Sequence, residues 1–477
     1  MIQVRLKIAI LLCVVILMQV IAQTSTVTLS SEKQTIRGFG GMNCPTWGAG
    51  LTTDQVTTAY GNGSGQIGMT IFRIMVNDNS SAWTNEVSAA QKAVSLGAIV
   101  FASPWNPPSS LCETVNGQKK LKTSSYSVYT DHLNSFITYM KGKGIDLYAI
   151  SVQNEPDYAS EWTAWAASDI LTFMKQNASS LQTKVIAPES YQFVKTMSDP
   201  ILNDSTALAN MDILGAHLYG TSISNYSYPL FQQKGTGKEL WMTEHYTDSK
   251  NDADLWPLAL GVATEIHHAL VTGQFNAYVW WYVIRSYGML KTSGAVSKRG
   301  YCMAQFSKFV RPGFVRVDAT AAPTPGVWVS AYKSDTSVVI VAIDTTTSSK
   351  TITFSIPGTT VSSLKKYTTS SSKSLSDDGT ATVSSGSFTG TLDAQSVSTW
   401  VGKYTTGIIN PDSKNKTGNI PNATIKLTEC KVYDLRGRQV NTNRINEFKN
   451  SRMTPNDCVY IVRDNKTGNV RYININK

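Results

Sequence analysis

Charged side chains are scarce in this sequence of 477 residues: they make up 16% of it, whereas hydrophobic residues make up 42%. A chain with so much apolar material and so little charge can bury one or more full cores, which excludes disorder as its overall state. The length predicts two to three domains. Aromatic residues are plentiful by contrast, with 11 Trp and 21 Tyr, and such rings suit the binding of neutral, flat ligands such as sugars.

Signatures of metal binding are missing as well. Neither C-x-x-C nor H-E-x-x-H occurs, so we expect no metal and no other cofactor. Cysteine is sparse, and Cys430 and Cys458 are candidates for a disulfide near the C-terminus, provided that the protein is exported. Whether Cys44 and Cys112 pair is left open by the sequence.

Positive charge is concentrated at the two ends of the chain. Of the net charge of +10, residues 1–22 carry +2 and residues 421–477 carry +6, which leaves +2 for residues 23–420. The body of the protein is therefore nearly neutral, and we expect no nucleic acid as a partner.

Long apolar runs are absent except at the N-terminus. Arg5 and Lys7 precede an apolar run at 8–20, and small residues around Ala22 offer a cleavage site. This pattern predicts a secretory signal over residues 1–22 and a protein that is secreted, extracellular or held at the cell surface. A membrane anchor is the alternative, but the run is shorter than the ~20 residues that a span needs. We expect no membrane span once the signal is removed.

The middle of the chain alternates short apolar runs with segments of helical spacing, such as 129–143 and 258–271. The runs are residues 37–43, 67–76, 98–106, 147–156, 184–190, 211–220, 238–246 and 277–286. Apolar strands that alternate with helices predict a parallel sheet covered on both faces. Eight such units favour an α/β fold of the (β/α)8, or TIM barrel, type. A doubly wound open sheet is the alternative, weakened because no G-x-G-x-x-G follows the first run.

Further domains are predicted on either side of the barrel at 37–318. Residues 319–403 are rich in Ser, Thr and Val with alternating patches, which is typical of an antiparallel β-sandwich. The strand expected within 23–36 joins that side domain. Residues 404–420 have the composition of a linker, and residues 421–477 are expected to form a small β module.

Two carboxylates stand at strand ends where a barrel places its function. Glu155 lies near the end of the fourth run, within Asn154-Glu155-Pro156, and Glu244 lies near the end of the seventh run. The fourth and seventh strands lie across a barrel from each other, so these carboxylates can face one ligand from opposite sides. Glycosidic cleavage needs such a pair, with one carboxyl group protonating the leaving oxygen while the other attacks the anomeric carbon or activates water. Either Glu taken alone would more simply be a structural ion-pair member.

Several motifs together resemble glycoside hydrolase family 30 and, within it, the bacterial glucuronoxylanase subfamily (subfamily 8). The resemblance extends over about residues 24–402. The motifs are Gly-Phe-Gly-Gly-Met-Asn at 38–43, Ser-Pro-Trp-Asn-Pro-Pro at 103–108, Gln-Asn-Glu-Pro-Asp-Tyr at 153–158, Thr-Glu-His-Tyr at 243–246 and Ser-Lys-Arg-Gly-Tyr at 297–301.

The resemblance implies a role for each carboxylate and its neighbours. Glu155 would be the acid/base and Glu244 the nucleophile of a retaining mechanism. Asn154 would bind the sugar 2-hydroxyl, and Arg73 would keep Glu244 ionised, since a nearby cation lowers the pKa of a carboxylate. By the same resemblance, His217 and Tyr219 would lie beside the nucleophile, with core packing as the alternative. Aromatic residues after the strands are expected to line the substrate cleft, unless they belong to the core. They are Trp47, Trp105, Tyr158 and Trp162.

Four residues after the last two strands match the glucuronic acid pocket of that subfamily. They are Arg285, Tyr287, Tyr246 and Ser249. A guanidinium binds a carboxylate bidentately, so Arg285 would hold the carboxylate of a (4-O-methyl)glucuronic acid branch on xylan. An ion pair that caps the last barrel helix is the alternative for Arg285.

These observations predict a secreted, monomeric, retaining endo-β-1,4-xylanase whose partner is xylan with glucuronic acid branches. A family 30 enzyme acting on undecorated xylan or on another β-glycan is one alternative. A non-catalytic carbohydrate-binding protein is another, which the intact Glu155 and Glu244 pair argues against.

The C-terminal module resembles the sorting domain of type IX secretion cargo. The elements that carry the resemblance are Tyr-Asp-Leu-Arg-Gly-Arg at 433–438 and Tyr-Ile-Val-Arg at 460–463. A small carbohydrate-binding or accessory β module is the alternative.

The two interpretations of this module predict different outcomes of its deletion. If residues 404–477 are a sorting signal, the truncated chain should hydrolyse its substrate at the rate of the full chain but accumulate in the periplasm. Cell fractionation with an activity assay on each fraction measures this. Full secretion of the truncated chain would refute a sorting role.

Overall fold

A computed structural model describes residues 23–158, 162–247 and 252–404, together with four short strands between 430 and 474. The chain divides into two compact units, Met1–Gly407 and Ile408–Lys477.

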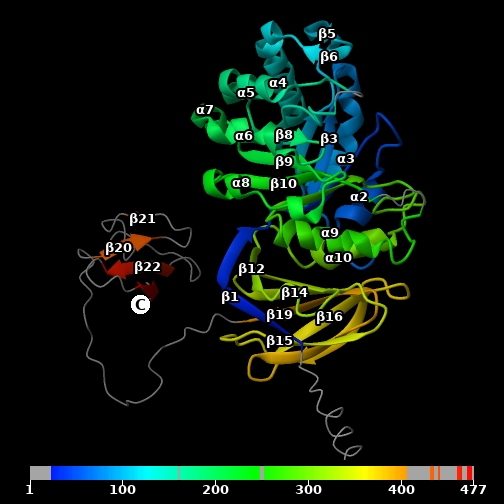
Figure 1. Ribbon diagram of the computed structural model, residues 1–477, viewed down its shortest axis with the longest axis vertical. Helices are drawn as coiled ribbons and strands as arrows, with labels where there is room; N and C mark the ends of the chain where they lie inside the picture. The colour runs from blue at the N-terminus through cyan, green and yellow to red at the C-terminus, as the bar shows by residue number, and fades with distance from the viewer. Residues whose placement is uncertain are drawn as a thin grey trace, which may run out of the picture. The chain divides into compact units, whose positions relative to one another are not determined.

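The first unit contains a closed barrel of eight parallel strands, as predicted (Figure 1). Each of the eight apolar runs supplies one strand. In barrel order these are β2 (Gly38–Met42), β3 (Ile71–Val76), β4 (Ile99–Pro104), β7 (Leu147–Ser151), β8 (Lys184–Ser190), β9 (Ile213–His217), β10 (Glu239–Glu244) and β11 (Ala277–Tyr282).

Helices alternate with these strands and cover the outside of the barrel. They are α2 (Thr53–Tyr60), α3 (Thr84–Ser95), α4 (Tyr126–Gly142), α5 (Ala167–Gln176), α6 (Lys195–Asn203), α7 (Ser205–Ala209), α8 (Pro229–Lys234), α9 (Leu260–Val271) and α10 (Lys298–Ser307). The predicted helices 129–143 and 258–271 correspond to α4 and α9. The β4–α4 connection also carries a hairpin, β5 (Cys112–Val115) and β6 (Gln118–Leu121).

Bulky side chains fill the interior of the barrel, as expected for this fold. Trp241 of β10 is fully buried there, and its ring packs edge-on against Phe101 of β4 at 5.6 Å between centroids. On the glycine-rich β2 the strands approach closely, because a Cβ on Gly40 would lie 2.0 Å from the carbonyl oxygen of Ile71. The barrel therefore has a solid floor, and its polar residues collect above it at the strand ends.

The fourth strand ends earlier than the apolar run predicted. β7 stops at Ser151, because the next residues leave the ladder for other partners. The amide of Asn154 donates to Pro104 O (2.8 Å) and that of Glu155 donates to Glu189 O (3.1 Å). Glu155 also has a φ of +44°, a left-handed conformation that a β-strand does not use.

The second part of this unit is a mostly antiparallel sheet of nine strands that folds over a core of its own. Its strands are β1 (Thr24–Thr35), β12 (Val315–Ala319), β13 (Val327–Lys333), β14 (Ser337–Asp344), β15 (Lys350–Ser355), β16 (Ser363–Thr369), β17 (Ser376–Thr382), β18 (Ser387–Leu392) and β19 (Ser396–Lys403). Phe354, Phe388 and Trp400 pack together in that core. One pair departs from the antiparallel expectation: β1 pairs with β15 in parallel, while it pairs with β12 antiparallel.

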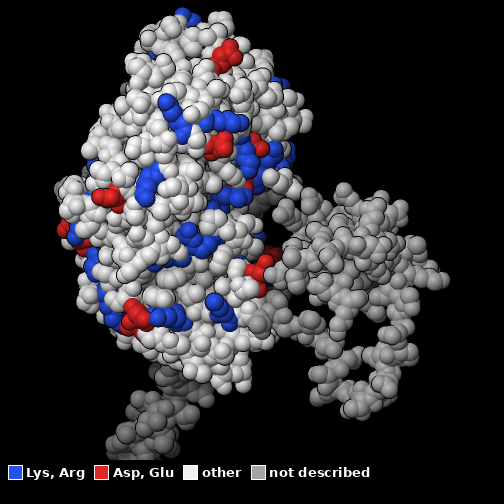
Figure 2. All heavy atoms as spheres, turned by 180° about the vertical axis from the view of Figure 1, so that it is seen from behind, with Lys and Arg blue, Asp and Glu red and all other residues white. Residues whose placement is uncertain are grey.

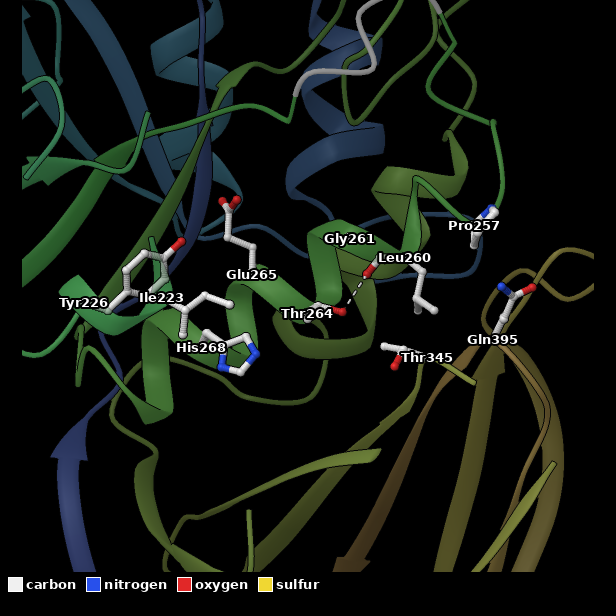
Figure 3. Close-up of a pocket in the computed structure, with 10 residues that line it drawn as sticks. All are labelled: Ile223, Tyr226, Pro257, Leu260, Gly261, Thr264, Glu265, His268, Thr345 and Gln395. Carbon is white, nitrogen blue, oxygen red and sulfur yellow. Dashed lines mark hydrogen bonds between the residues drawn. The ribbon is translucent and has the colours of Figure 1, made fainter. Parts of the chain in front are cut away.

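Helices α9 and α10 lie between the barrel strands and this sheet (Figure 1). Gln305 of α10 bonds to both Thr369 and Thr399 of the sheet (2.9 and 2.8 Å), and His268 of α9 packs edge-on against Trp328. A pocket of about 380 Å³ opens at this junction (Figure 3). It is lined by Ile223, Tyr226, Pro257, Leu260, Gly261, Thr264, Glu265, His268, Thr345 and Gln395.

Charged groups are scattered over the face of the described residues in Figure 2. Lys and Arg lie there in separate groups with Asp and Glu among them, and most of the surface is uncharged. Within the described part of the chain, no helix is both long and apolar enough to span a membrane. The predicted signal over 1–22 lies outside the described residues.

The second unit contains a four-stranded antiparallel sheet in the order β21-β20-β22-β23. The strands are β20 (Cys430–Tyr433), β21 (Gln439–Val440), β22 (Val459–Asp464) and β23 (Val470–Asn474). Cys458, the expected partner of Cys430, lies outside the described residues.

Candidate active site

Glu155 and Glu244 meet above the floor of the barrel. Glu155 follows β7 and Glu244 is the last residue of β10; they are 3% and 4% exposed. One oxygen of each carboxyl group and a ring nitrogen of His217 all lie within 4.8 Å of one another. The two carboxylates selected from the sequence, because each lies at the C-terminal end of a barrel strand, thus lie side by side in the structure.

Arg73, from the middle of β3, connects the groups around them. Its fully buried guanidinium forms a salt bridge with Glu244 through Nη1. Its Nη2 donates to Asn154 Oδ1 (2.6 Å) and lies 3.1 Å from Glu189 Oε1. Arg73 therefore orients the predicted nucleophile and the amide beside the predicted acid/base at the same time.

His217 and Tyr219 stand at the end of β9 and contact one carboxylate each. His217 Nδ1 lies 2.7 Å from Glu155 Oε1 and 4.0 Å from Glu244 Oε1. The hydroxyl of Tyr219 donates to Glu244 Oε1 (2.7 Å). Both residues are in the place that the resemblance implied, and core packing does not describe their polar contacts.

The pKa values of Glu155 and His217 are both raised above their ordinary values. Burial and the charge of Glu244 raise the pKa of Glu155 to about 7, against the opposing influence of His217 and Arg73. Burial lowers the pKa of His217, but Glu244, Glu155 and Glu189 outweigh it and raise the pKa to about 9. At neutral pH the imidazole therefore carries its proton, and the raised pKa of Glu155 allows its carboxyl group to carry one as well.

Ion pairs join the charged groups of this cluster. The three groups are close enough to surround a cation. Glu244 is paired with Arg73, and His217 is paired with Glu155 and Glu189.

Asn154 presents its amide nitrogen to the site. Its oxygen is used by Arg73, and its Nδ2 is buried without a hydrogen-bond partner among the described residues. The loop that carries it is fixed by Gln153, whose Nε2 donates to Trp105 O (2.7 Å) and to Asn154 O (2.9 Å).

Aromatic side chains surround these polar groups in two sets. On one side, Trp47 is 42% exposed and its ring meets that of Trp105 edge-on at 5.1 Å, and Trp281 packs against both. Trp105 itself is 3% exposed, so most of its ring faces protein, including the guanidinium of Arg73 at 4.9 Å.

On the other side, tyrosines follow one another in contact. Tyr158 packs against Tyr191 (4.6 Å between centroids), Tyr191 stacks on Tyr219 (5.1 Å), Tyr219 meets Tyr246 edge-on (5.3 Å), and Tyr246 stacks on Tyr287 (4.8 Å). Trp162 adjoins Tyr158 at 5.6 Å and donates from its Nε1 to Glu155 O (3.3 Å).

Arg285 follows β11 and is anchored to the loop after β2. Its Nη2 donates to the carbonyl of Trp47 (3.0 Å), and its guanidinium lies 4.2 Å from the centre of the Tyr282 ring. Among the described residues, the titratable groups that act on Arg285 are Tyr282, Tyr287 and Cys44, and no salt bridge joins it to a carboxylate. Tyr287 and Tyr246, two of its three expected partners, lie in the tyrosine series, whereas Ser249 is outside the described residues.

Four further residues of the site were not selected from the sequence. They are Ser103, Glu189, Tyr191 and Trp281. Glu189 is fully buried near the end of β8, within Ala-Pro-Glu-Ser, so the rule that found Glu155 and Glu244 applied to it equally. Cys44 and Cys112, whose pairing was left open, are free thiols.

Known proteins share both the sequence and the fold of this chain. The profile of glycosyl hydrolase family 59 matches residues 83–304, which is part of the barrel. Glucuronoxylanase XynC of Bacillus subtilis (strain 168) is 55% identical over 387 residues, which cover 80% of this chain and 92% of that protein. A family 30 endoxylanase from Clostridium papyrosolvens has a TM-score of 0.76 at 46% identity, with 80% of this chain and all of that chain covered.

The chain belongs to glycoside hydrolase family 30. This assignment is preferred to family 59 because the family 59 match covers less than half of the chain. A second structure, the family 30 subfamily 8 xylanase of Clostridium acetobutylicum, also supports family 30. Its TM-score is 0.74 at 38% identity, again with 80% of this chain and all of that chain covered. The family 30 resemblance, the barrel with its side sheet, and the glycoside hydrolase class are thereby confirmed.

Proposed function

We propose that this chain is a secreted endo-β-1,4-xylanase that cleaves glucuronoxylan with retention, at bonds chosen by a glucuronic acid branch. The observation that carries the proposal is the buried pair Glu155 and Glu244, with oxygens within 4.8 Å, in a chain 55% identical to a glucuronoxylanase. Retaining glycosidases hold their carboxyl groups ~5–5.5 Å apart, whereas inverting ones leave room for a water between them.

In the first step, an oxygen of Glu244 attacks the anomeric carbon of a xylose residue. The bond from that carbon to the glycosidic oxygen breaks, and the leaving oxygen takes the proton of Glu155. Glu244 becomes a neutral glycosyl ester and Glu155 becomes a carboxylate. The raised pKa of Glu155 and the salt bridge of Glu244 to Arg73 suit these two starting states.

In the second step, water attacks the anomeric carbon from the face opposite its ester bond to Glu244. Glu155 takes a proton from that water, the ester bond breaks, and Glu244 returns as a carboxylate. The unpartnered Nδ2 of Asn154 is suited to donate to the sugar 2-hydroxyl, where such bonds strengthen in the transition state.

The branch would be bound by Arg285 with Tyr287, Tyr246 and Ser249. A guanidinium carries five N–H donors, so its contact with Trp47 leaves others for a carboxylate. Because Trp47 is exposed beside it, the ring and the guanidinium can hold one decorated sugar unit. Export through the signal at 1–22, and sorting by residues 421–477, belong to the same proposal and rest on the sequence alone.

The pH dependence follows from Glu155. A carboxyl group with its pKa raised to about 7 is protonated below that pH, so kcat/KM on glucuronoxylan should fall as pH rises through about 7. Glu155→Gln should remove this alkaline limb and lower the rate by about 10²- to 10⁴-fold. Initial rates between pH 4 and 9 measure both effects.

Unchanged hydrolysis by Glu244→Gln would refute the nucleophile assignment.

The branch requirement is tested by paired digestions of glucuronoxylan and arabinoxylan, with products weighed by mass spectrometry. We expect one uronic acid per glucuronoxylan product, at a fixed position. Arg285→Ala should lower kcat/KM on glucuronoxylan by roughly 10- to 100-fold, as the loss of a charge-assisted hydrogen bond implies, and should spare unsubstituted xylan. Arg285→Lys keeps the charge without the fork and should be intermediate. Equal rates of Arg285→Ala and the parent on glucuronoxylan would defeat the proposal.

A further inference from the structure

Beneath the two catalytic carboxylates lies a third, Glu189, that the proposed mechanism does not use. It is fully buried near the end of β8, and its Oε1 contacts Arg73 Nη2 (3.1 Å), Ser103 Oγ (3.2 Å) and His217 Nε2 (3.5 Å). We propose that Glu189 is a positioning residue that supplies the fixed negative charge of the site and so holds Arg73 and His217 in their working states. This inference rests on the proposed function.

Glu189 contacts both buried cations of the site, Arg73 and His217. Arg73 reaches Glu244 through Nη1 and Asn154 through the same Nη2 that contacts Glu189. His217 reaches Glu155 through Nδ1, the ring nitrogen that does not face Glu189. The backbone adds a further link, because Glu189 O accepts from the amide of Glu155. Both of these residues adopt left-handed conformations, with φ of +62° and +44°. Side chain and main chain of one residue thus orient both halves of the catalytic pair.

A charge count gives the reason for a third carboxylate. With Glu155 protonated, Arg73 and protonated His217 are balanced by Glu189 and Glu244. When Glu244 becomes a neutral ester, Glu155 is a carboxylate and the balance is again zero. Without Glu189 the site would carry a surplus positive charge at both stages, which favours the ionised form of Glu155 and so opposes its resting protonation.

The surroundings of Glu189 keep it ionised. Burial acts to raise its pKa, but Arg73, His217 and the hydroxyl of Ser151 lower it to about 2. The other groups that face the acid/base are the phenols of Tyr191 and Tyr219, whose pKa values burial and the carboxylates raise above the ordinary value for tyrosine. Glu189 therefore keeps its charge over the pH range in which Glu155 and His217 titrate.

Two substitutions separate charge from shape at this position. Glu189→Gln keeps the size of the side chain and removes its charge, whereas Glu189→Asp keeps the charge and shortens the side chain. We expect Glu189→Gln to lower kcat on glucuronoxylan at least tenfold and to move the alkaline limb of kcat/KM to lower pH by about one unit. Glu189→Asp should keep the alkaline limb of kcat/KM at the same pH as in the parent. A residue that serves packing alone would give the reverse order, with Gln closer to the parent than Asp.

The state of His217 supplies a readout that needs no substrate. The chain has only five histidines, so the imidazole nitrogens can be followed individually by NMR of the ¹⁵N-labelled full chain. In the parent, His217 should keep its proton to a pH near 9, and in Glu189→Gln its pKa should fall by about one unit or more.

Glu239→Gln is the matched control, because Glu239 begins the strand that ends in Glu244 and forms a salt bridge with Arg37 away from the catalytic groups. It should leave the pH limb and the His217 titration as in the parent. If a folded Glu189→Gln chain shows both readouts unchanged, the inference is wrong. Loss of the proposed function appears separately, as a parent chain that does not hydrolyse xylan.

Discussion

The salt bridge between Arg73 and Glu244 is the interaction on which the rest of the site depends. A guanidinium that is fully buried loses its hydration, and this cost is offset only when several partners surround it. Here the partners are two carboxylates, an amide oxygen, a hydroxyl and the face of an indole ring. Each of them is held in one orientation by the same cation, so the geometry of the site is set from its centre outward.

Closure of the barrel is what brings those partners together. Arg73 lies on β3, Ser103 on β4, Glu189 on β8 and Glu244 on β10, and Asn154 follows β7. No two of them are neighbours in the sequence, yet the parallel strands deliver all of them to one end of the barrel. The side chains below, such as Trp241, exclude water from underneath. Electrostatic effects are consequently strong at this position.

The sequence predicted most of this arrangement. Each apolar run corresponded to a barrel strand, because a strand buried on both faces is recognisable from its composition alone. Glu155 and Glu244 were recognised because their chemistry requires a pair. Glu189 was missed because a carboxylate that only balances charge needs no partner carboxylate and has no motif of its own. Its position at the end of an apolar run could still be read from the sequence.

Other features depend on tertiary structure and had no local signal. That β1 runs parallel to β15 depends on where the chain returns after the whole barrel has formed. The 3% exposure of Trp105 follows from its packing beneath Trp47, whereas composition marks both equally as ligand-binding candidates. The early end of β7 is set by acceptors on β4 and β8.

The place of β1 also has a consequence for synthesis on the ribosome. This strand is the first described part of the chain to emerge, yet its partners β12 and β15 follow the entire barrel, and the hydroxyl of Ser25 bonds to Thr320 O, 295 positions later. An unpaired strand edge must therefore wait while the barrel is translated, and such edges pair readily with other chains. During biogenesis the edge of β1 therefore needs shielding until β12 and β15 have been made.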